Sequence, residues 1–326
     1  MSVEPKSSSA PNQAVLITGG TGFIGSNLIR RLLQEKALVH LLVRQTSRRQ
    51  NLDEISHLIR WHMTDLTDYS RVLRVVQEVQ PAMVFHIAGS SFNHPPTTDV
   101  FEHAQVNVMG TLTLLEALKN AAPDARLIFA GSAAEYGAGT DLSEDQLPVP
   151  ATLLGATKVA ATNLIQMYAR LYGLQTTVIR IFTPFGPYEQ PKRLIPHAIL
   201  SALKKEEVLL TDGRQGRDFL YIDDLVEAMR CAGQVNTPPG SVINICSGKS
   251  TRIVEIVQKI LDLMGNPVGF RTGALPTRKD EIWDVSGGCL KAKELLGWEP
   301  TTELEVGLSK AIDWWRLRLG AETVYV

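Results

Sequence analysis

Residues 14–25 read AVLITGGTGFIG, an apolar run that passes directly into a glycine-rich turn. Residues 26–35 follow as SNLIRRLLQE, in which apolar side chains recur at helical spacing. A buried strand, a glycine turn and a helix in this order are typical of the first unit of a doubly wound α/β domain. This stretch therefore sets the expectation for the fold of the chain around it.

Apolar strands and amphipathic helices continue to alternate up to about residue 182. The expected strands are 14–20, 38–43, 57–64, 82–89, 126–132 and 175–182, and the longer helices between them are 26–35, 69–79, 106–122 and 157–173. Strands that are apolar throughout indicate a parallel sheet covered on both faces. We predict an α/β protein with a doubly wound parallel (Rossmann) sheet and a smaller C-terminal α/β substrate lobe.

Prolines interrupt the chain after about residue 183, and shorter helical segments follow. We therefore predict three parts: a disordered leader at 1–13, a dinucleotide-binding domain at 14–183, and a lobe at 184–326 that mainly binds substrate. Parts of 215–247 are expected to return to the first domain.

Composition excludes several classes of function. The chain has 326 residues, 44% of them hydrophobic, and its 33 basic and 34 acidic side chains nearly cancel. This balance disfavours nucleic acid or an anionic membrane as the main partner. No run approaches the roughly 18 apolar residues of a spanning helix, and the leader lacks the apolar middle of an export signal, so we expect a cytoplasmic protein. Three widely spaced cysteines predict neither a disulfide framework nor a metal site.

The glycine turn predicts the cofactor site. Glycines let the backbone approach a pyrophosphate, which then rests on the helix N-terminus. The residues expected to bind it are Gly19, Gly22, Phe23, Ile24 and Gly25. After the second strand, where a carboxylate would select NAD, the chain has Arg44, and a guanidinium suits a 2′-phosphate. We therefore expect NADP(H), with NAD(H) as the second choice.

Further motifs resemble the extended short-chain dehydrogenase/reductase superfamily, of the kind that modifies nucleotide-sugars. The resemblance covers residues 14–319 and rests on the glycine turn, Asp65-Leu66, His86-Ile87-Ala88, Asn107, Arg217-Asp218-Phe219 and Leu296-Gly297-Trp298-Glu299-Pro300. Val43-Arg44 and residues 131–137, GSAAEYG, are most similar to NADP-dependent GDP-sugar dehydratases and reductases.

The resemblance implies roles for individual residues. Asp65 and Leu66 are expected at the adenine, Ala88 along the cofactor, and Asn107 in support of the active site. Ser132 stands at the family's catalytic Ser/Thr position and is expected to hydrogen-bond the sugar oxygen. Lys158 stands at the family's lysine position. It is expected to bind the nicotinamide ribose and to lower the pKa of a neighbouring phenol.

One departure from the family pattern concerns the proton. The family's acid–base tyrosine lies four residues before the lysine, where this chain has Leu154. Moving hydride at carbon requires a proton to move at oxygen, which leucine cannot supply. Three explanations remain open: Tyr136 or Glu135 has taken the role, Ser132 relays the proton through a water, or the protein binds cofactor without turnover.

A second departure concerns the reaction. Family dehydratases carry acidic residues at the positions of Ala133 and Ala134, and two alanines cannot serve an elimination. Glu135 follows one residue later, which on a strand turns the side chain to the other face. The first choice is thus a 4-keto-sugar reductase using NADP(H). The alternatives are an epimerase with retained NAD(P) and a catalytically silent dinucleotide-binding protein.

The substrate residues are expected at the sheet edge and in the second lobe. Relatives bind nucleotide phosphates at the positions of Arg217 and Arg278, and Arg193 is a further cationic candidate. Ser90 and Ser91 follow the fourth strand, at the edge where ligands bind, and Thr183 replaces an asparagine common in relatives. The resemblance to the family also implies a homodimer that forms through the helices around 101–119 and 157–173.

Overall fold

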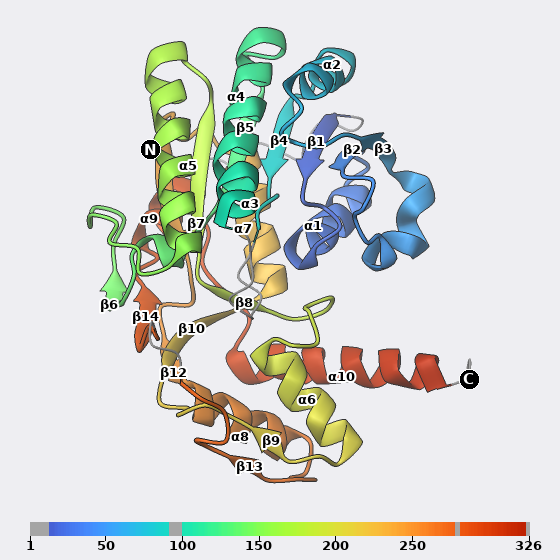
Figure 1. The fold of residues 1–326 in the computed structure, drawn as a ribbon, viewed down its shortest axis with the longest axis vertical. Coiled ribbons are helices and arrows are strands. Elements are labelled where there is room, and N and C mark those ends of the chain that lie inside the picture. Colours follow the sequence, from blue (N-terminus) through green and yellow to red (C-terminus); the bar gives the residue numbers. More distant parts are fainter. Residues whose placement is uncertain (1–12, 91–99, 278–280, 324–326) are drawn as a thin grey trace. The chain divides into compact units, whose positions relative to one another are not determined.

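The computed structural model describes residues 13–90, 100–277 and 281–323. Residues 1–12 of the expected leader lie outside these ranges, as do Ser91 and Arg278. Within them, the largest sheet has seven strands in the order β11-β7-β5-β4-β1-β2-β3 (Figure 1). The strands are β1 (Ala14–Thr18), β2 (Leu38–Val43), β3 (Arg60–Met63), β4 (Met83–His86), β5 (Arg126–Ser132), β7 (Thr176–Ile181) and β11 (Ser241–Ile245).

The pairings confirm the predicted fold class. Strand β1 pairs in parallel with β2 and β4, β2 pairs in parallel with β3, and β4 with β5. The strand order reverses beside β1, which is the arrangement of a doubly wound fold. Its central strands are apolar because both faces are covered: Leu16 and Ile17 in β1 and Val84 and Phe85 in β4 are fully buried.

Helices and short turns connect the strands. The α-helices are α1 (Phe23–Gln34), α2 (Tyr69–Val79), α3 (Val100–Ala104), α4 (Gly110–Ala121), α5 (Leu153–Tyr172), α6 (Leu194–Lys204), α7 (Ile222–Gln234), α8 (Ile253–Leu263), α9 (Leu290–Leu296) and α10 (Leu304–Thr323). Two 3₁₀ segments cover Gln50–Leu58 and Ala133–Glu135, and a π-helical turn covers Gln105–Met109. The strand expected at 57–64 is shorter, because its first residues end the longer 3₁₀ segment.

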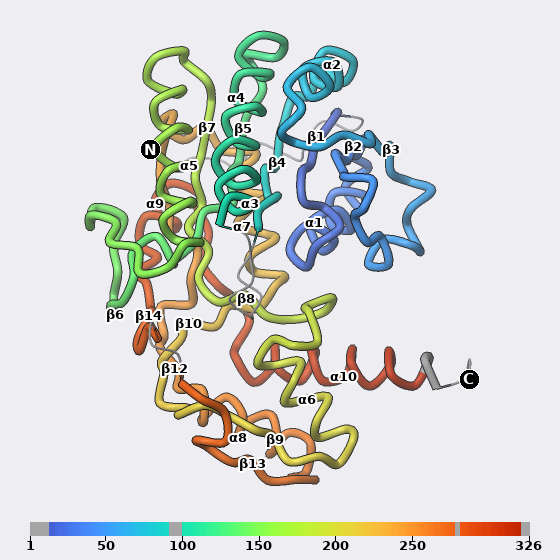
Figure 2. The backbone as a smooth tube through the Cα atoms, in the orientation of Figure 1, coloured from blue at the N-terminus to red at the C-terminus, as the bar shows by residue number. Residues whose placement is uncertain are grey.

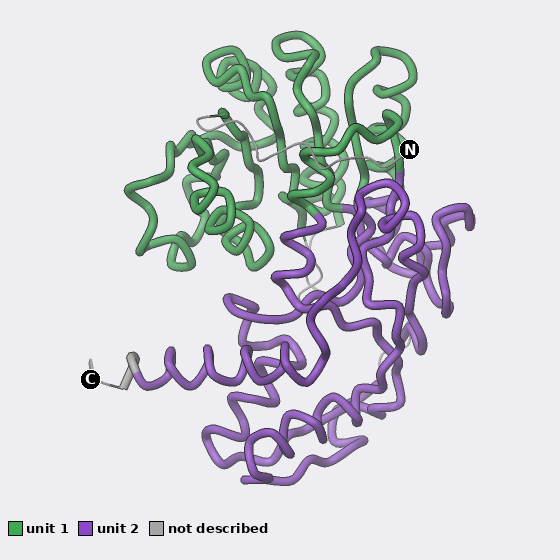
Figure 3. The backbone as a smooth tube through the Cα atoms, turned by 180° about the vertical axis from the view of Figure 1, so that it is seen from behind, with its two compact units in different colours: residues 1–130, 160–178, 229–241 green, residues 131–159, 179–228, 242–326 purple. Residues whose placement is uncertain are grey.

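The chain forms two compact units (Figure 3). Unit 1 contains residues 1–130, 160–178 and 229–241, and unit 2 contains residues 131–159, 179–228 and 242–326. The first passage between the units falls at residue 130, within β5, earlier than the expected boundary at 183. Residues 229–241, inside the segment expected to return, belong to unit 1.

Unit 2 adds strands that the apolar pattern did not predict. A five-stranded sheet has the order β12-β10-β14-β6, with β8 paired to β10, and β13 pairs with β9; their paths are traced in Figure 2. The strands are β6 (Gly139–Leu142), β8 (Thr183–Phe185), β9 (Val208–Leu209), β10 (Gly216–Tyr221), β12 (Ser250–Arg252), β13 (Phe270–Arg271) and β14 (Asp284–Gly287). Helix α6 packs on α8 and α10.

A histidine pair joins the two outermost strands on one side of the large sheet. His40 Nδ1 of β2 lies 3.0 Å from His62 Nε2 of β3, and the rings stack with centroids 5.2 Å apart. Burial, together with the neighbouring charges of His62 and Arg60, lowers the pKa of His40 to about 4. Burial also lowers the pKa of His62, although the carboxylate of Glu78 opposes it. His40 is therefore neutral in the folded protein between pH 6.5 and about 4, where a free histidine is protonated.

This pair predicts acid sensitivity. Between pH 6.5 and about 4, unfolded His40 binds a proton that folded His40 does not, so the free energy of unfolding falls as pH falls through this window. Substituting His40→Leu is expected to flatten that part of the stability curve, measured by urea unfolding at a series of pH values. Substituting the exposed His57→Leu serves as the control and is expected to leave the slope unchanged. Equal slopes for His40→Leu and the wild type would contradict the prediction.

Candidate active site

The glycine turn of unit 1 leaves no room for side chains. Gly19 has φ +75°, and a Cβ there would lie 2.5 Å from the backbone nitrogen of Ala88. A Cβ on Gly25 would lie 2.5 Å from the Gly19 carbonyl oxygen. Gly22 begins α1 without a side-chain cap, and the first turn, which contains Phe23 and Ile24, has no acidic residue. This bare helix start fits the pyrophosphate of a dinucleotide.

A buried chain of hydrogen bonds connects the end of β1, which precedes the glycine turn, to the end of β4. Thr18 Oγ1 lies 2.7 Å from Nδ1 of the fully buried His86 and accepts a hydrogen bond from the Ala88 backbone at 3.2 Å. His86 Nε2 lies 2.9 Å from Thr111 Oγ1, which donates to the Asn107 carbonyl at 2.7 Å. The predicted residues Ala88 and Asn107 are thus connected through His86.

Asn107 holds the end of the β4 segment. It lies in the π-helical turn, and its Oδ1 accepts a hydrogen bond of 2.8 Å from the Ser90 backbone nitrogen. Its Nδ2 donates to the Ser90 carbonyl at 3.3 Å. Ser90 Oγ also lies 3.4 Å from Nε2 of His103, a buried residue that the sequence analysis did not single out. Turns of π-helix often occur at functional sites, which is consistent with a supporting role for Asn107.

The residues predicted for the nucleoside end also lie in unit 1. Arg44 follows β2, its side chain is half exposed, and one guanidinium nitrogen lies 3.9 Å from the Glu102 carboxylate. Burial alone would raise the pKa of Asp65, but hydrogen bonds from Thr67 and the charge of Arg44 hold it below its usual value. Leu66 packs against Gly110, where a Cβ would come within 2.9 Å of its side chain.

Unit 2 holds the predicted Ser132 at the end of β5. Its Oγ accepts a hydrogen bond of 3.1 Å from the Ala134 backbone, and its own backbone nitrogen donates to Glu135 Oε1 at 2.9 Å. The other oxygen of this fully buried carboxylate accepts a hydrogen bond of 3.0 Å from Arg180 Nε on β7. Glu135 therefore joins the Ser132 backbone to a buried cation.

Tyr136 is held in the same cluster by its ring and its hydroxyl. The Arg180 guanidinium carbon lies 4.4 Å from the centre of the ring. The hydroxyl donates a hydrogen bond of 2.8 Å to Asn244 Oδ1, and Asn244 Nδ2 donates to the Leu142 carbonyl. Burial raises the pKa of the phenol, with Arg180 opposing it. The Tyr136 proton is thus already used in a buried hydrogen bond.

Lys158 is buried on α5, with 6% of its surface exposed. Burial disfavours the charged ammonium and lowers the pKa of Lys158 to about 8, although the nearby Glu135 carboxylate opposes this. Leu154 lies one helical turn before it on the same face and is partly exposed. Glu135 thus interacts with Lys158 and with the backbone that positions Ser132.

Helix α5 begins in close contact with the turn that follows Ser132. A Cβ on Gly155 would lie 2.1 Å from the Ala134 carbonyl oxygen and 2.9 Å from Pro150 Cβ. Only glycine therefore lets the first turn of α5 approach so closely. This contact fixes the start of the helix that carries Lys158.

The other predicted substrate residues of unit 2 lie on separate elements. Arg217 donates hydrogen bonds to Glu281 Oε1 at 2.8 Å and to the Gly216 carbonyl. Glu281, which the sequence analysis did not predict, therefore already holds the Arg217 guanidinium. Thr183 lies in β8, paired with β10. Arg193 Nε lies 3.6 Å from the buried Glu189, and burial raises the pKa of that carboxyl to about 7.

Residues that hold the predicted site residues of unit 2 went unmentioned in the sequence analysis. Arg180 stands in the strand TTVIRI, Asn244 in the strand SVINI, and Glu281 pairs with Arg217. The first two carry a recognisable signal, because a charge or an amide inside an apolar strand must find a partner when buried. Their partners lie 45 and 108 residues away, so the sequence pattern alone does not identify them.

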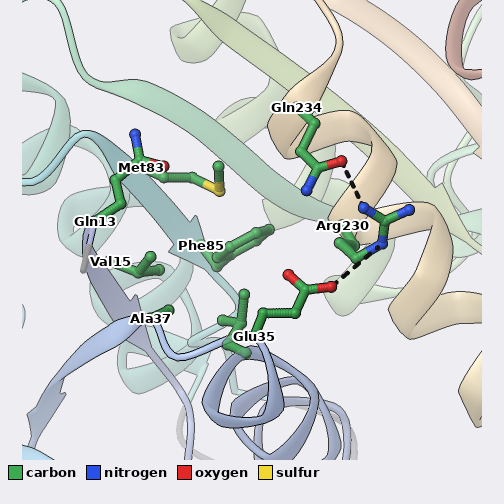
Figure 4. A pocket seen from close by; sticks show the side chains of 9 residues that line it. Gln13, Val15, Glu35, Ala37, Met83, Phe85, Arg230 and Gln234 are labelled. Atoms are coloured by element: carbon green, nitrogen blue, oxygen red, sulfur yellow. Dashed lines mark hydrogen bonds and ion pairs between the residues drawn. The ribbon is translucent and has the colours of Figure 1, made fainter. Parts of the chain in front are cut away.

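A separate pocket lies in unit 1 at the amino ends of β1, β2 and β4 (Figure 4). Its cavity of about 10 Å³ has room for one water molecule, not for a dinucleotide. Arg230 lies 3.8 Å from the Glu35 carboxylate at its edge, on the side of α7. Among the described residues there is no cluster of His, Cys, Asp and Glu that could hold a metal ion, and no helix long and apolar enough to cross a membrane.

The contact at Gly155 predicts a measurable cost of adding one methyl group. Substituting Gly155→Ala forces α5 away from the Ala134 carbonyl, and we expect overpacking to reduce the free energy of unfolding by about 1–3 kcal/mol. Urea unfolding measures this. The control is Gly320→Ala on α10, where a Cβ would meet no atom within 4 Å and helix propensity should stabilise by about 0.5–1 kcal/mol. Equal effects at the two positions would refute the close contact.

Comparison with known proteins identifies the family. The chain is 29% identical to dTDP-glucose 4,6-dehydratase of Xanthomonas campestris over 92% of each chain. The crystal structure of UDP-glucose 4-epimerase from Thermotoga maritima with UDP-glucose is similar, with a TM-score of 0.86 and 27% identity over 94% of this chain and 99% of that one.

A third similar structure is UDP-glucuronic acid 4-epimerase from Bacillus cereus in complex with UDP-glucuronic acid and NAD. It has a TM-score of 0.84 and 26% identity, over 93% of this chain and 99% of that one. Residues 15–246 match the family described as NAD dependent epimerase/dehydratase. The resemblance inferred from the motifs is confirmed: the chain belongs to the NAD dependent epimerase/dehydratase family, within the extended short-chain dehydrogenase/reductase superfamily.

Proposed function

We propose that this protein is a dinucleotide-dependent oxidoreductase that acts on a nucleotide-activated sugar. The observation that carries the proposal is the buried arrangement of Ser132, Glu135 and Lys158, in which one carboxylate interacts with the lysine and with the serine backbone. The glycine turn of unit 1 adds a start of α1 shaped for a pyrophosphate. The similar epimerases and dehydratase named above act on UDP- and dTDP-sugars, which supports the same substrate class here.

In the proposed reaction the residues of the chain orient the sugar and move its proton. When bound, the dinucleotide exchanges a hydride with a carbon of the sugar. The Ser132 hydroxyl donates a hydrogen bond to the oxygen on that carbon, which polarises it. Glu135 fixes the Ser132 backbone, so that the hydroxyl keeps its direction. Arg217 remains a candidate for the substrate phosphates, and Arg193, Thr183 and Ser90 for further contacts.

Dehydration is disfavoured by what surrounds Ser132. Ala133 is buried, and the carbonyl of Ala134 contacts the start of α5. Neither offers an acid, and Glu135 is held in its pair with Arg180. An elimination needs an acid and a base at neighbouring carbons. Hydride transfer without loss of water therefore fits this site better.

Reduction of a 4-keto-sugar with NADP(H) is the reaction that we propose first. Arg44 supports it, because this half-exposed guanidinium at the end of β2 offers charge to a 2′-phosphate where NAD-binding folds usually carry an acid. Epimerisation with a retained NAD is the second candidate. The similarity to two 4-epimerases, one of them in complex with NAD, favours it.

Two measurements separate these candidates. Mass spectrometry of the nucleotides released on denaturing freshly purified protein identifies the resident cofactor. UDP-, dTDP- and GDP-linked 4-keto-sugars are then incubated with NADPH, and the corresponding hexoses alone, with products followed by NMR. NADPH consumption matched by new hydroxyl product supports the reductase, and sugar interconversion without net cofactor change supports the epimerase. Bound cofactor without either reaction would refute the proposal and leave a silent dinucleotide-binding protein.

The cofactor choice can be tested at Arg44. The Arg44→Asp variant removes a charged partner of the 2′-phosphate and repels it, so we expect NADPH affinity to fall roughly tenfold to hundredfold, the equivalent of about 1.5–3 kcal/mol. NADH affinity should not fall. Fluorescence titration with both cofactors measures this. The Arg74→Asp variant on the exposed face of α2 makes the same charge change and serves as the control. A loss shared equally by NADPH and NADH would contradict the NADP(H) assignment.

A further inference from the structure

Two of the three cysteines of the chain come together in unit 2, although they are far apart in the sequence. Cys246 directly follows β11, and Cys289 directly precedes α9. Cys246 is fully buried in an apolar cluster, and the partly exposed Cys289 packs against the same cluster. The Cys246 thiol donates a hydrogen bond to the Cys289 sulfur. Both thiols are free in the structure, so the pair is reduced.

A buried carboxylate holds the two cysteine-bearing segments together. Asp218 of β10 is fully buried, and its Oδ1 accepts hydrogen bonds from the backbone nitrogen and the hydroxyl of Ser247, at 2.6 and 2.7 Å. Its Oδ2 accepts hydrogen bonds from the backbone nitrogens of Gly248 at 3.0 Å and Gly287 at 3.3 Å. One side chain therefore joins the residues just after the first cysteine to the end of β14, just before the second.

A side-chain amide makes a second connection between the same segments. Asn244 Nδ2 donates to the Gly288 carbonyl at 3.3 Å and to the Leu142 carbonyl at 2.8 Å. The Gly288 backbone nitrogen also donates to the Leu142 carbonyl, at 2.9 Å. A Cβ built on Gly248 would lie 4.0 Å from Cys289 Sγ, so the turn after β11 passes beside that sulfur. Hydrogen bonds on both sides of the pair thus fix the two segments next to each other.

The two sulfurs have different surroundings. The hydrogen bond from Cys246 lowers the pKa of the Cys289 thiol, although burial and the Asp218 carboxylate oppose this. The same hydrogen bond, together with burial, raises the pKa of the Cys246 thiol. The thiolate is the form of cysteine that reacts with oxidants. An accessible cysteine of lowered pKa beside a second cysteine that can resolve it is typical of redox-sensing sites.

The pair also lies close to the residues that follow Ser132. The apolar cluster that contains Cys246 includes Ala133 and Tyr136. The Tyr136 hydroxyl donates to Asn244, which stands two residues before Cys246 in the chain. A covalent change at the two sulfurs would therefore occur beside the proposed active site.

We propose that Cys246 and Cys289 form a reversible disulfide, in which Cys289 is the sulfur that reacts first with a peroxide. The Cys289 thiolate attacks one peroxide oxygen, so that a sulfur–oxygen bond forms, the oxygen–oxygen bond breaks, and the leaving hydroxide takes up the proton that the thiol released. The Cys246 sulfur then attacks the sulfur of this sulfenic acid. The sulfur–sulfur bond forms as the sulfur–oxygen bond breaks, and the departing hydroxide takes the Cys246 proton.

The overall step is balanced. Two thiols and one hydrogen peroxide give one disulfide and two water molecules, with the sulfurs oxidised and the peroxide oxygens reduced. A small dithiol returns the pair to the reduced state by thiol–disulfide exchange. This modification site does not depend on the proposed function, because it requires neither the dinucleotide nor a sugar.

The first test uses the full wild-type chain with hydrogen peroxide as the only oxidant. Reduced protein is treated with peroxide, denatured, alkylated with N-ethylmaleimide and analysed by intact mass and peptide mapping. We expect two of the three thiols to escape alkylation and one cross-linked peptide to contain Cys246 and Cys289, with dithiothreitol restoring all three thiols. Any other pattern would overturn the proposal, including three alkylated thiols, a disulfide that contains Cys231, or a link between two chains.

The second test determines the order of the two sulfurs by trapping the sulfenic acid with dimedone. In Cys246→Ala the resolving sulfur is missing, so we expect a dimedone adduct at Cys289 and no disulfide. In Cys289→Ser we expect neither product. Cys231→Ser is the matched control, because Cys231 is also partly exposed but lies on α7 in unit 1, and it should form the disulfide as the wild type does.

The outcomes of the trapping experiment are distinct. An adduct at Cys246 in the Cys289→Ser variant, or none at Cys289 in Cys246→Ala, would overturn the assignment of Cys289 as the reacting sulfur. Circular dichroism before peroxide treatment shows which variants are folded. The experiment on the wild type needs no variant, so it decides whether the disulfide forms even where a substitution prevents folding.

Discussion

A buried ion pair between Glu135 and Arg180 organises the part of unit 2 that contains the proposed active site. The two side chains are almost fully buried and lie on elements that are adjacent in space but distant in sequence. Removing one partner of such a pair leaves an uncompensated charge and commonly destabilises a protein by about 3–5 kcal/mol. The second oxygen of Glu135 reaches the Ser132 backbone, so the pair fixes the serine as well. Arg180 in turn lies against the Tyr136 ring, which extends the same arrangement to Asn244.

This arrangement changes the interpretation of Glu135 and Tyr136. Both stand beside Ser132 in the sequence, which made them natural candidates to replace a missing acid–base residue. Their contacts in the structure favour positioning instead, because the carboxylate is shared between Arg180 and a backbone nitrogen and the phenol is bound to an amide. A proton donor must release its proton to the substrate, and groups whose protons or lone pairs are held in buried networks do so poorly.

The sequence predicted the glycine turn of unit 1 more completely than the contacts around Ser132 in unit 2. The glycine turn follows from local rules, because the strand, the turn and the start of the helix are contiguous in the sequence. Gly19 and Gly25 stand at the positions where a Cβ would collide with the backbone. The strand at Ser241–Ile245 was missed, because Asn244 interrupts its apolar pattern. The pairing of Glu135 with Arg180 could not be predicted, since it depends on the register of elements 45 residues apart. The 3₁₀ turn after Ser132 could not be predicted either. It decides where the Glu135 side chain points, and no local pattern in residues 133–135 (AAE) indicates it.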